Sequence, residues 1–327
     1  MNELTYRRPR DTADALEALA HGQGKPLAGG TNLVDLMRQN VEHPGALVDV
    51  SRLARTIEGL PDGGLRLGAG AKNSAVAADR RVRERFPVLA EAILHGASGQ
   101  IRNMASIAGN VMQRTRCPYF YDGAARCNKR APGTGCDAIH GVNRMHAVLG
   151  TSASCIAAHP SDLCVALALL DATVQISGPR GDRAVAINDF YRLPGDSPHI
   201  ETALAIDELI TAVDLPAAPI AQRSLYRKVR DRSSFAFALV SVAAALELDG
   251  TTIRDVRIAL GGVATRPWRA RLAEDALRGQ PVSEAVFRRA AELELAPAVG
   301  HGHNDFKIEL ARRVITGALD ELAGASR

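Results

Sequence analysis

The first 55 residues alternate between strand-like and helix-like patterns of apolar and polar positions. Asp11 and Thr12 form a helix N-cap, and Leu16 and Leu19 give the helix that follows an apolar stripe. Strand, helix, strand, helix and strand are predicted in turn for LTYRRP (4–9), DTADALEALA (11–20), KPLAGG (25–30), NLVDLMRQN (32–40) and ALVDVSRL (46–53). This order predicts a compact β-α-β-α-β unit over residues 1–55.

The next part of the chain, residues 56–217, mixes short strands with helices. In GGLRLGAGA the side chains of Leu65, Leu67 and Ala69 share one face, which is typical of a half-buried strand. Helices are also predicted for 74–86 and 87–97, a capped helix running into a strand for PSDLCVALALLDATVQI (160–176), and a strand for ELITAVDLP (208–216). PAAPIAQ (216–222) has the composition of a linker.

A separate α+β domain is predicted for residues 218–325. The longest apolar run of the chain, FAFALVSVAAALEL (235–248), is interpreted as a buried helix. It is too short to span a bilayer and contains Ser241 and Glu247. IRDVRIALGGVA and two Ala-rich helical stretches follow it.

Composition and charge narrow the classes of protein that this chain can represent. Its 327 residues, 46% of them hydrophobic, are enough for two or three domains. A net charge of +4 offers no concentrated basic face, so no nucleic-acid partner is predicted. The N-terminus lacks an apolar signal core, and no membrane span is predicted. We expect synthesis in the cytoplasm, with a periplasmic location only by co-export with a signal-bearing partner.

Two glycine-rich turns stand out, and the first of them lies between a predicted strand and a predicted helix. The first contains Gly29, Gly30, Thr31 and Asn32, and the second is built around Gly109 and the asparagine after it. Glycine permits close backbone approach, and the unpaired N–H groups that follow favour a phosphate. Neither turn has the P-loop or dinucleotide-fold fingerprint. Each alone could be a plain turn, but the two together favour a large phosphate-bearing cofactor.

Four cysteines fall in the 51 residues between Asn110 and Asp162, with the spacing C-x9-C-x8-C-x18-C. A loop of this length inside a compact domain is usually functional, disordered or held together by an internal cross-link. Four thiolates suit zinc or an iron–sulfur cluster, and the wide spacing argues against the paired knuckles of zinc sites. Cytosolic synthesis disfavours disulfides. The candidate metal ligands are Cys117, Cys127, Cys136 and Cys155.

The fifth cysteine and the nearby histidines are given simpler roles. Cys164 lies at core-facing spacing with Leu167, so it is predicted to pack as a small apolar side chain. His140, His146 and His159 could supply a ligand or a proton, but surface or hydrogen-bonded structural roles are favoured.

Four segments, taken in order, resemble one family. LAGGTNLVDLM, IRNMASIAGN, HPSDLCVALALLDA and LYRKVRDRSSFAFALVSVAAAL are similar to motifs of the FAD-binding subunits of the xanthine dehydrogenase and aldehyde oxidase family, which are molybdenum hydroxylases. The resemblance covers essentially the whole chain. It implies an α+β fold, with a vanillyl-alcohol-oxidase-type FAD domain of two α/β subdomains (1–55 and 56–217) and a C-terminal domain of antiparallel sheet and helices.

The resemblance also implies the residues that contact FAD. The first glycine turn would wrap the pyrophosphate, Asp162 would contact the adenosine side, and Ile210 and Lys228 would lie beside the isoalloxazine. Ala108 departs from the glycine of many relatives. The full set is Pro26, Leu27, Ala28, Gly29, Gly30, Thr31, Asn32, Leu33, Val34, Ser74, Ser106, Gly109, Asn110, Asp162, Ile210 and Lys228.

The cysteine-bearing insertion, residues 113–158, is similar to the loop of the flavoprotein subunits of periplasmic aldehyde oxidases. That resemblance implies a [4Fe-4S] cluster and an electron-transfer subunit that works with a molybdenum-cofactor large subunit and a [2Fe-2S] small subunit. It implies no catalytic residue for the substrate on this chain. Two alternatives stay open: a 4-hydroxybenzoyl-CoA-reductase-like flavoprotein, whose loop matches less well, and a zinc-stabilised scaffold without redox function.

Overall fold

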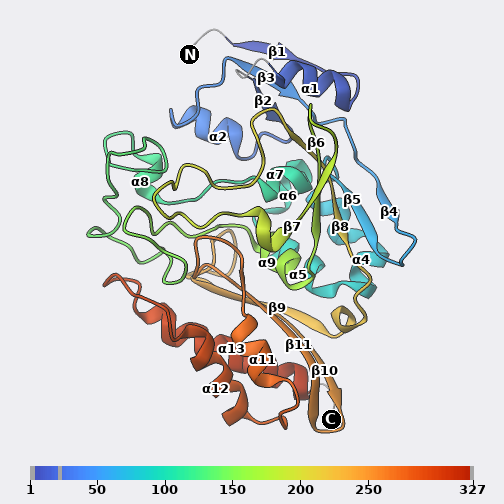
Figure 1. The fold of residues 1–327 in the computed structure, drawn as a ribbon, viewed down its shortest axis with the longest axis vertical. Coiled ribbons are helices and arrows are strands. Elements are labelled where there is room, and N and C mark those ends of the chain that lie inside the picture. Colours follow the sequence, from blue (N-terminus) through green and yellow to red (C-terminus); the bar gives the residue numbers. More distant parts are fainter. Residues whose placement is uncertain (1–3, 21–23, 325–327) are drawn as a thin grey trace.

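The computed structural model describes residues 4–20 and 24–324, which form three sheets with helices packed between and around them (Figure 1). The sheets use residues 5–49, 57–215 and 224–269 in turn. The predicted α+β class is therefore confirmed, while the domain boundaries at 55 and 217 stay a prediction. Among the described residues no helix has the length and apolar character needed to cross a membrane.

The N-terminal unit is the predicted β-α-β-α-β arrangement. Its parallel strands lie in the order β1-β3-β2, and Asp11 caps α1 by accepting the Asp14 N–H at 2.9 Å. Val48 of the central strand and Leu19 of α1 are buried together in its small core. The elements are β1 (Thr5–Arg7), α1 (Thr12–Ala20), β2 (Gly24–Leu27), α2 (Leu33–Arg38) and β3 (Ala46–Asp49).

The middle unit is an antiparallel sheet of order β4-β5-β8-β6-β7 with helices on it. The helix predicted over 74–86 is broken at Asp79, whose carboxylate accepts the Arg81 N–H and starts a new helix. The elements are β4 (Ile57–Gly59), β5 (Leu65–Gly68), α3 (Asn73–Ala78), α4 (Arg80–Arg85), α5 (Pro87–His95), α6 (Gly99–Met104), α7 (Ile107–Val111), α8 (Pro118–Tyr121), α9 (Asp162–Leu169), β6 (Thr173–Ser177), β7 (Arg183–Ala186), α10 (Ile187–Phe190) and β8 (Leu209–Leu215).

The C-terminal unit is an antiparallel sheet of order β12-β11-β10-β9, with α11 to α13 covering one face (Figure 1). A short 3-10 helix, η1 (Pro219–Gln222), leads into it through the segment predicted as a linker. The elements are β9 (Ser224–Val229), β10 (Val240–Asp249), β11 (Thr252–Gly261), β12 (Trp268–Arg269), α11 (Arg271–Leu277), α12 (Glu284–Leu295) and α13 (Phe306–Gly324).

The prediction of a buried helix over 235–248 is wrong, because most of this run is the central strand β10. Val242 and Ala244 point into the C-terminal core, while Ala243 and Ala245 point into the core of the middle unit. A strand buried on both faces shows no apolar–polar alternation, so its pattern cannot be told from that of a buried helix.

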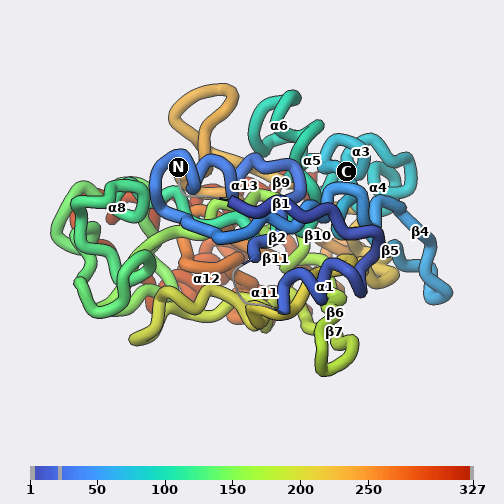
Figure 2. Tube along the Cα trace, turned by 90° about the horizontal axis from the view of Figure 1, so that it is seen from above, coloured from blue at the N-terminus to red at the C-terminus, as the bar shows by residue number. Residues whose placement is uncertain are grey.

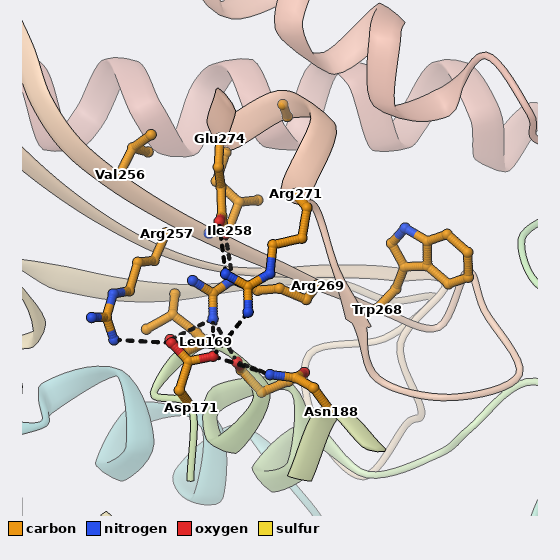
Figure 3. A network of polar contacts seen from close by, with 12 residues as sticks. Leu169, Asp171, Asn188, Val256, Arg257, Ile258, Trp268, Arg269, Arg271 and Glu274 are labelled. Atoms are coloured by element: carbon orange, nitrogen blue, oxygen red, sulfur yellow. Dashed lines mark hydrogen bonds and ion pairs between the residues drawn. The ribbon is translucent and has the colours of Figure 1, made fainter. Parts of the chain in front are cut away.

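A buried ionic network joins the C-terminal unit to the end of α9 (Figure 3). Arg269 donates to the carbonyl oxygens of Ala168 and Leu169 at 2.9 and 3.1 Å and to Asp171 at 2.7 Å, and it also binds Glu274. Its guanidinium thus caps the C-terminus of α9, where carbonyl groups lack helical partners.

The cysteine-bearing segment around α8 and the edge strand β4 lie at opposite ends of the molecule (Figures 1 and 2). Between Tyr121 and Asp162 the segment contains no regular helix or strand. It is instead held by turns and isolated bridges, including one between Cys127 and Cys136.

Candidate cofactor site

A cavity of about 670 Å³ lies between the three-stranded sheet and the five-stranded sheet. Its walls come from residues 24–33, from α7 and the turn before it, from β8, and from the extended segment 191–206. The volume falls in the range of roughly 300–1,000 Å³ that is usual for cofactor sites.

The first glycine turn exposes backbone atoms, without covering side chains, to the cavity. A Cβ on Gly29 would lie 2.0 Å from the carbonyl oxygen of Met104, so no side chain fits there, and Gly30 has a φ of +72°. The N–H groups of Gly29, Gly30 and Thr31 donate to no residue that the structure describes. The turn therefore presents unpaired donors to whatever occupies the cavity.

Asn32 extends this set of donors. Its side-chain oxygen accepts the backbone N–H of Arg114 at 3.1 Å, which fixes the orientation of the amide. Its Nδ2 is buried and has no hydrogen-bond partner in the part of the chain that the structure describes. A buried amide donor without a partner is costly, and a phosphate oxygen would relieve that cost.

The second predicted glycine turn is not a turn in the structure, because Gly109 and the residue after it lie within the short helix α7. The Ser106 hydroxyl caps this helix by accepting the Gly109 N–H at 3.2 Å, and a Cβ on Gly109 would lie 3.0 Å from that hydroxyl oxygen. Ser106, Ala108 and Gly109 all line the cavity. The departure from glycine at Ala108 therefore falls on the cavity wall.

A chain of ion pairs forms another part of the wall. Arg114 binds both Glu42 and Glu201 at 2.7 Å, Lys25 binds Glu42 at 3.0 Å, and Lys129 lies 3.4 Å from Glu201. Burial alone would raise the pKa of Glu42, but the two cations outweigh it and lower that pKa. The chain of contacts carries one cation more than it has carboxylates, which suits an anionic ligand.

The sequence did not indicate these charged residues, because they come from distant parts of the chain.

Of the predicted FAD contacts, the cavity lining includes Pro26, Ala28, Gly29, Gly30, Thr31, Asn32, Leu33, Ser106, Gly109 and Ile210. It does not include Leu27, Val34, Ser74, Asn110, Asp162 or Lys228.

Asp162 and Lys228 form a buried ion pair with each other. Lys228 Nζ lies 2.8 Å from Asp162 Oδ2, and the side chains are only 1% and 8% exposed. The Tyr226 hydroxyl donates to the other carboxylate oxygen at 2.6 Å, and the N-cap of α9 is Ser161. This pair links α9 to β9, so its two members lie together rather than at opposite ends of the cavity; their roles as FAD contacts stay predictions.

Cys117, Cys127, Cys136 and Cys155 line one small second cavity, and no disulfide joins them. Burial raises the pKa of Cys117 to about 12 and that of Cys155 to about 11. Backbone N–H groups point at the sulfur atoms, as Ala157 does at Cys155 over 3.5 Å. Thiols with pKa values this high carry their protons at neutral pH, and a metal bound by these sulfur atoms would displace those protons.

The remaining cysteine and the histidines take separate positions. Cys164 lies in the main core, where its sulfur is 3.0 Å from the Tyr191 hydroxyl, so the packing prediction is confirmed. His146 Nε2 is 3.1 Å from Cys117 Sγ, and burial lowers the pKa of this imidazole to about 4. His159 lines the large cavity, and His140 is exposed.

The two cavities are neighbours. Lys129, Cys155 and Ala157 line both of them, so the two cavities share part of a wall. Within the described residues, no group of three or more Cys, His, Asp or Glu side chains could hold a metal ion.

Two family models together cover nearly all of the chain. The FAD binding domain in molybdopterin dehydrogenase matches residues 2–218, and the CO dehydrogenase flavoprotein C-terminal domain matches residues 224–322. The chain belongs to the FAD-binding subunits of the molybdenum hydroxylases. The predicted family and fold class are thereby confirmed.

Individual relatives agree with this family. The aldehyde oxidoreductase FAD-binding subunit PaoB of Escherichia coli is 49% identical over 326 residues, which is 98% of each chain. The carbon monoxide dehydrogenase medium chain of Afipia carboxidovorans is 25% identical over 96% of this chain and 95% of its own. The quinoline 2-oxidoreductase structure from Pseudomonas putida 86 shares the fold, with a TM-score of 0.76, 24% identity and 98% and 97% coverage.

Proposed function

We propose that this chain is the electron-transfer subunit of a molybdenum-dependent aldehyde oxidoreductase and that it holds both FAD and a [4Fe-4S] cluster. Its partners would be a molybdenum-cofactor subunit, which oxidises the aldehyde, and a [2Fe-2S] subunit. The similarity to PaoB along the whole chain supports the aldehyde assignment. Bound FAD supplies the redox chemistry that links these partners to a final electron acceptor.

The residues of the large cavity fit FAD by their donors and their shape. The unpaired N–H groups of Gly29, Gly30 and Thr31, with the Asn32 amide, would bind the pyrophosphate oxygens. The Arg114 ion pairs would hold the cavity wall in place and add positive potential. On this arrangement the chain binds and orients the cofactor and does no chemistry on the substrate.

One observation carries the proposal of a cluster: four cysteines, three of them buried and Cys136 partly buried, line one cavity that shares wall residues with the FAD cavity. A [4Fe-4S] cluster takes one thiolate on each iron, so its ligands stand apart instead of meeting at a point. Cysteines placed in this way suit a cluster better than the single zinc ion of the scaffold alternative. Their position beside the FAD cavity favours a redox role.

Iron and sulfide analysis of the full chain tests the cluster. We expect about four iron and four sulfide per chain, together with flavin and iron–sulfur absorption bands. Cys127→Ala should lose the iron, and Cys164→Ala is the matched control that should keep it, since Cys164 lies outside the cysteine cavity. A colourless chain that contains zinc would overturn the proposal.

The direction of electron flow separates this proposal from a 4-hydroxybenzoyl-CoA-reductase-like subunit, in which electrons would run toward molybdenum. Midpoint potentials of the flavin and the cluster, measured on the same sample, decide between the two directions. Fractionation of cells into cytoplasm and periplasm decides whether the assembled protein stays where it is made or is co-exported with a signal-bearing partner.

A further inference from the structure

The imidazole of His146 lies between the cysteine cavity and the C-terminal unit. Its Nε2 is 3.1 Å from Cys117 Sγ, and only 2% of the residue is exposed. Its Nδ1 is buried and contacts no hydrogen-bonding group among the described residues. A buried N–H without an acceptor is rarer than a buried lone pair without a donor, so the proton belongs on Nε2.

The backbone of His146 is held in place from both sides. Its N–H donates to the carbonyl oxygen of Asn143 at 2.9 Å. Its own carbonyl oxygen accepts Lys307 Nζ at 3.0 Å and Asn304 Nδ2 at 3.4 Å. The side chains of Asn143, Asn304 and Lys307 are all fully buried, which leaves the peptide little room to move and fixes where the ring points.

The other three cysteines of the cavity have no such side-chain contact in the part of the chain that the structure describes. Cys155 Sγ accepts a hydrogen bond from the backbone N–H of Ala157 at 3.5 Å. Backbone N–H groups can donate to a cysteine sulfur whatever the side chain of the donating residue is. A hydrogen bond from the buried imidazole of His146 instead requires that particular side chain. The electronic environment of the Cys117 sulfur therefore depends on one side chain, that of His146, which can be changed by mutation.

We infer that His146 is a positioning residue for the Cys117 thiolate: it donates its Nε2–H to Sγ, fixes that ligand, and makes the group held by the four cysteines easier to reduce. The inference rests on the proposed function. Reduction adds negative charge to the cluster and its sulfur atoms, and a hydrogen bond to a ligand sulfur stabilises that charge. Removing the donor should therefore lower the reduction potential.

The test measures the midpoint potential of the cluster in the full chain by redox titration followed by electron paramagnetic resonance. His146→Leu should lower the equilibrium constant of one-electron reduction about tenfold, which is a shift of about 59 mV toward negative potential. His146→Gln keeps an N–H donor at a similar reach and should recover most of that shift. His140→Leu, in the same loop but exposed, should leave the potential unchanged.

A second measurement, of magnetic coupling between the cluster and histidine nitrogen, can be made on the wild-type protein. Its main result therefore does not depend on the folding of a variant. With isotopically labelled histidine, the reduced cluster should show a weak magnetic coupling to a histidine nitrogen, and His146→Gln should abolish it. Equal potentials in the wild type and His146→Leu at equal iron content, or no histidine coupling, would overturn this inference and leave the proposed function standing. A wild-type chain without iron would overturn both.

Discussion

Replacement of Arg269 by methionine should destabilise the protein by about 3–5 kcal/mol, because it would remove the nearest cation of a buried carboxylate. Glu274, which binds Arg269 (Figure 3), is fully buried, and Arg269 is only 6% exposed. Glu274 would keep the Ile258 N–H at 2.8 Å and two more distant cations, Arg278 at 3.6 Å and Arg271 at 3.9 Å. The carbonyl oxygens of Ala168 and Leu169 at the end of α9 would also lose their donor.

The matched control is Arg271→Met. Arg271 binds the same carboxylates, Asp171 at 3.3 Å and Glu274 at 3.9 Å, but it is 59% exposed, so its loss should cost less than about 1 kcal/mol. The double variant Arg269→Met with Glu274→Met removes both buried charges, so it should be more stable than Arg269→Met alone.

Urea denaturation of the full chain gives these free energies. The only tryptophan, Trp268, precedes Arg269 and donates to Glu294 at 2.8 Å, so its fluorescence reports on the C-terminal unit. Circular dichroism reports on the whole chain and shows whether the C-terminal unit unfolds together with the rest of the protein. If Arg269→Met costs no more than Arg271→Met, the reasoning that burial makes this ion pair indispensable is refuted.

Three further predictions follow from single positions. Gly29→Ala should lose bound FAD, assayed as flavin released per chain, whereas Gly59→Ala, where a Cβ meets nothing within 4 Å, should keep it. The Arg183 guanidinium lowers the pKa of Glu208 to about 2, so the stability advantage of wild type over Glu208→Gln should be full above about pH 4.5 and vanish toward pH 2 in acid titrations. Burial lowers the pKa of Lys307 from 10.5 to about 7, so between these pH values the native state has lost a proton that the unfolded state still binds. Wild type should therefore gain stability relative to Lys307→Met as the pH rises from 7 to 10.5. An unchanged difference across either pH range would contradict the corresponding assignment.

The elements that could be predicted from the sequence are those with a local cause. The Asp11 cap, the apolar stripe of α1 and the glycine turn after β2 depend on neighbours within a few residues, and the structure has all three. The break at Asp79 also has a local cause, a side chain that accepts an N–H two residues on, but the continuous polar and apolar pattern concealed it.

β10 and the charged cavity wall could not be predicted, because each depends on tertiary contacts that the local pattern of apolar and polar residues does not show. The strand state of β10 depends on β9 and β11 at its edges and on two cores, one against each face. The contacts of Arg114 with Glu42 and Glu201 span 72 and 87 residues. No spacing rule connects such positions, and only the packed fold brings them together.

The cysteine-bearing segment is anchored on both sides, and this explains how so irregular a loop can form a defined site. Toward the large cavity, the backbone N–H of Arg114 donates to the side-chain oxygen of Asn32, whose Nδ2 has no partner among the described residues. Toward the C-terminal unit, Val148 N–H donates to Val263 at 2.8 Å, and Lys307 binds the carbonyl oxygen of His146. Rearrangement of the loop would therefore disturb its contacts with the first glycine turn and with the C-terminal unit, and these contacts favour one defined conformation of the segment.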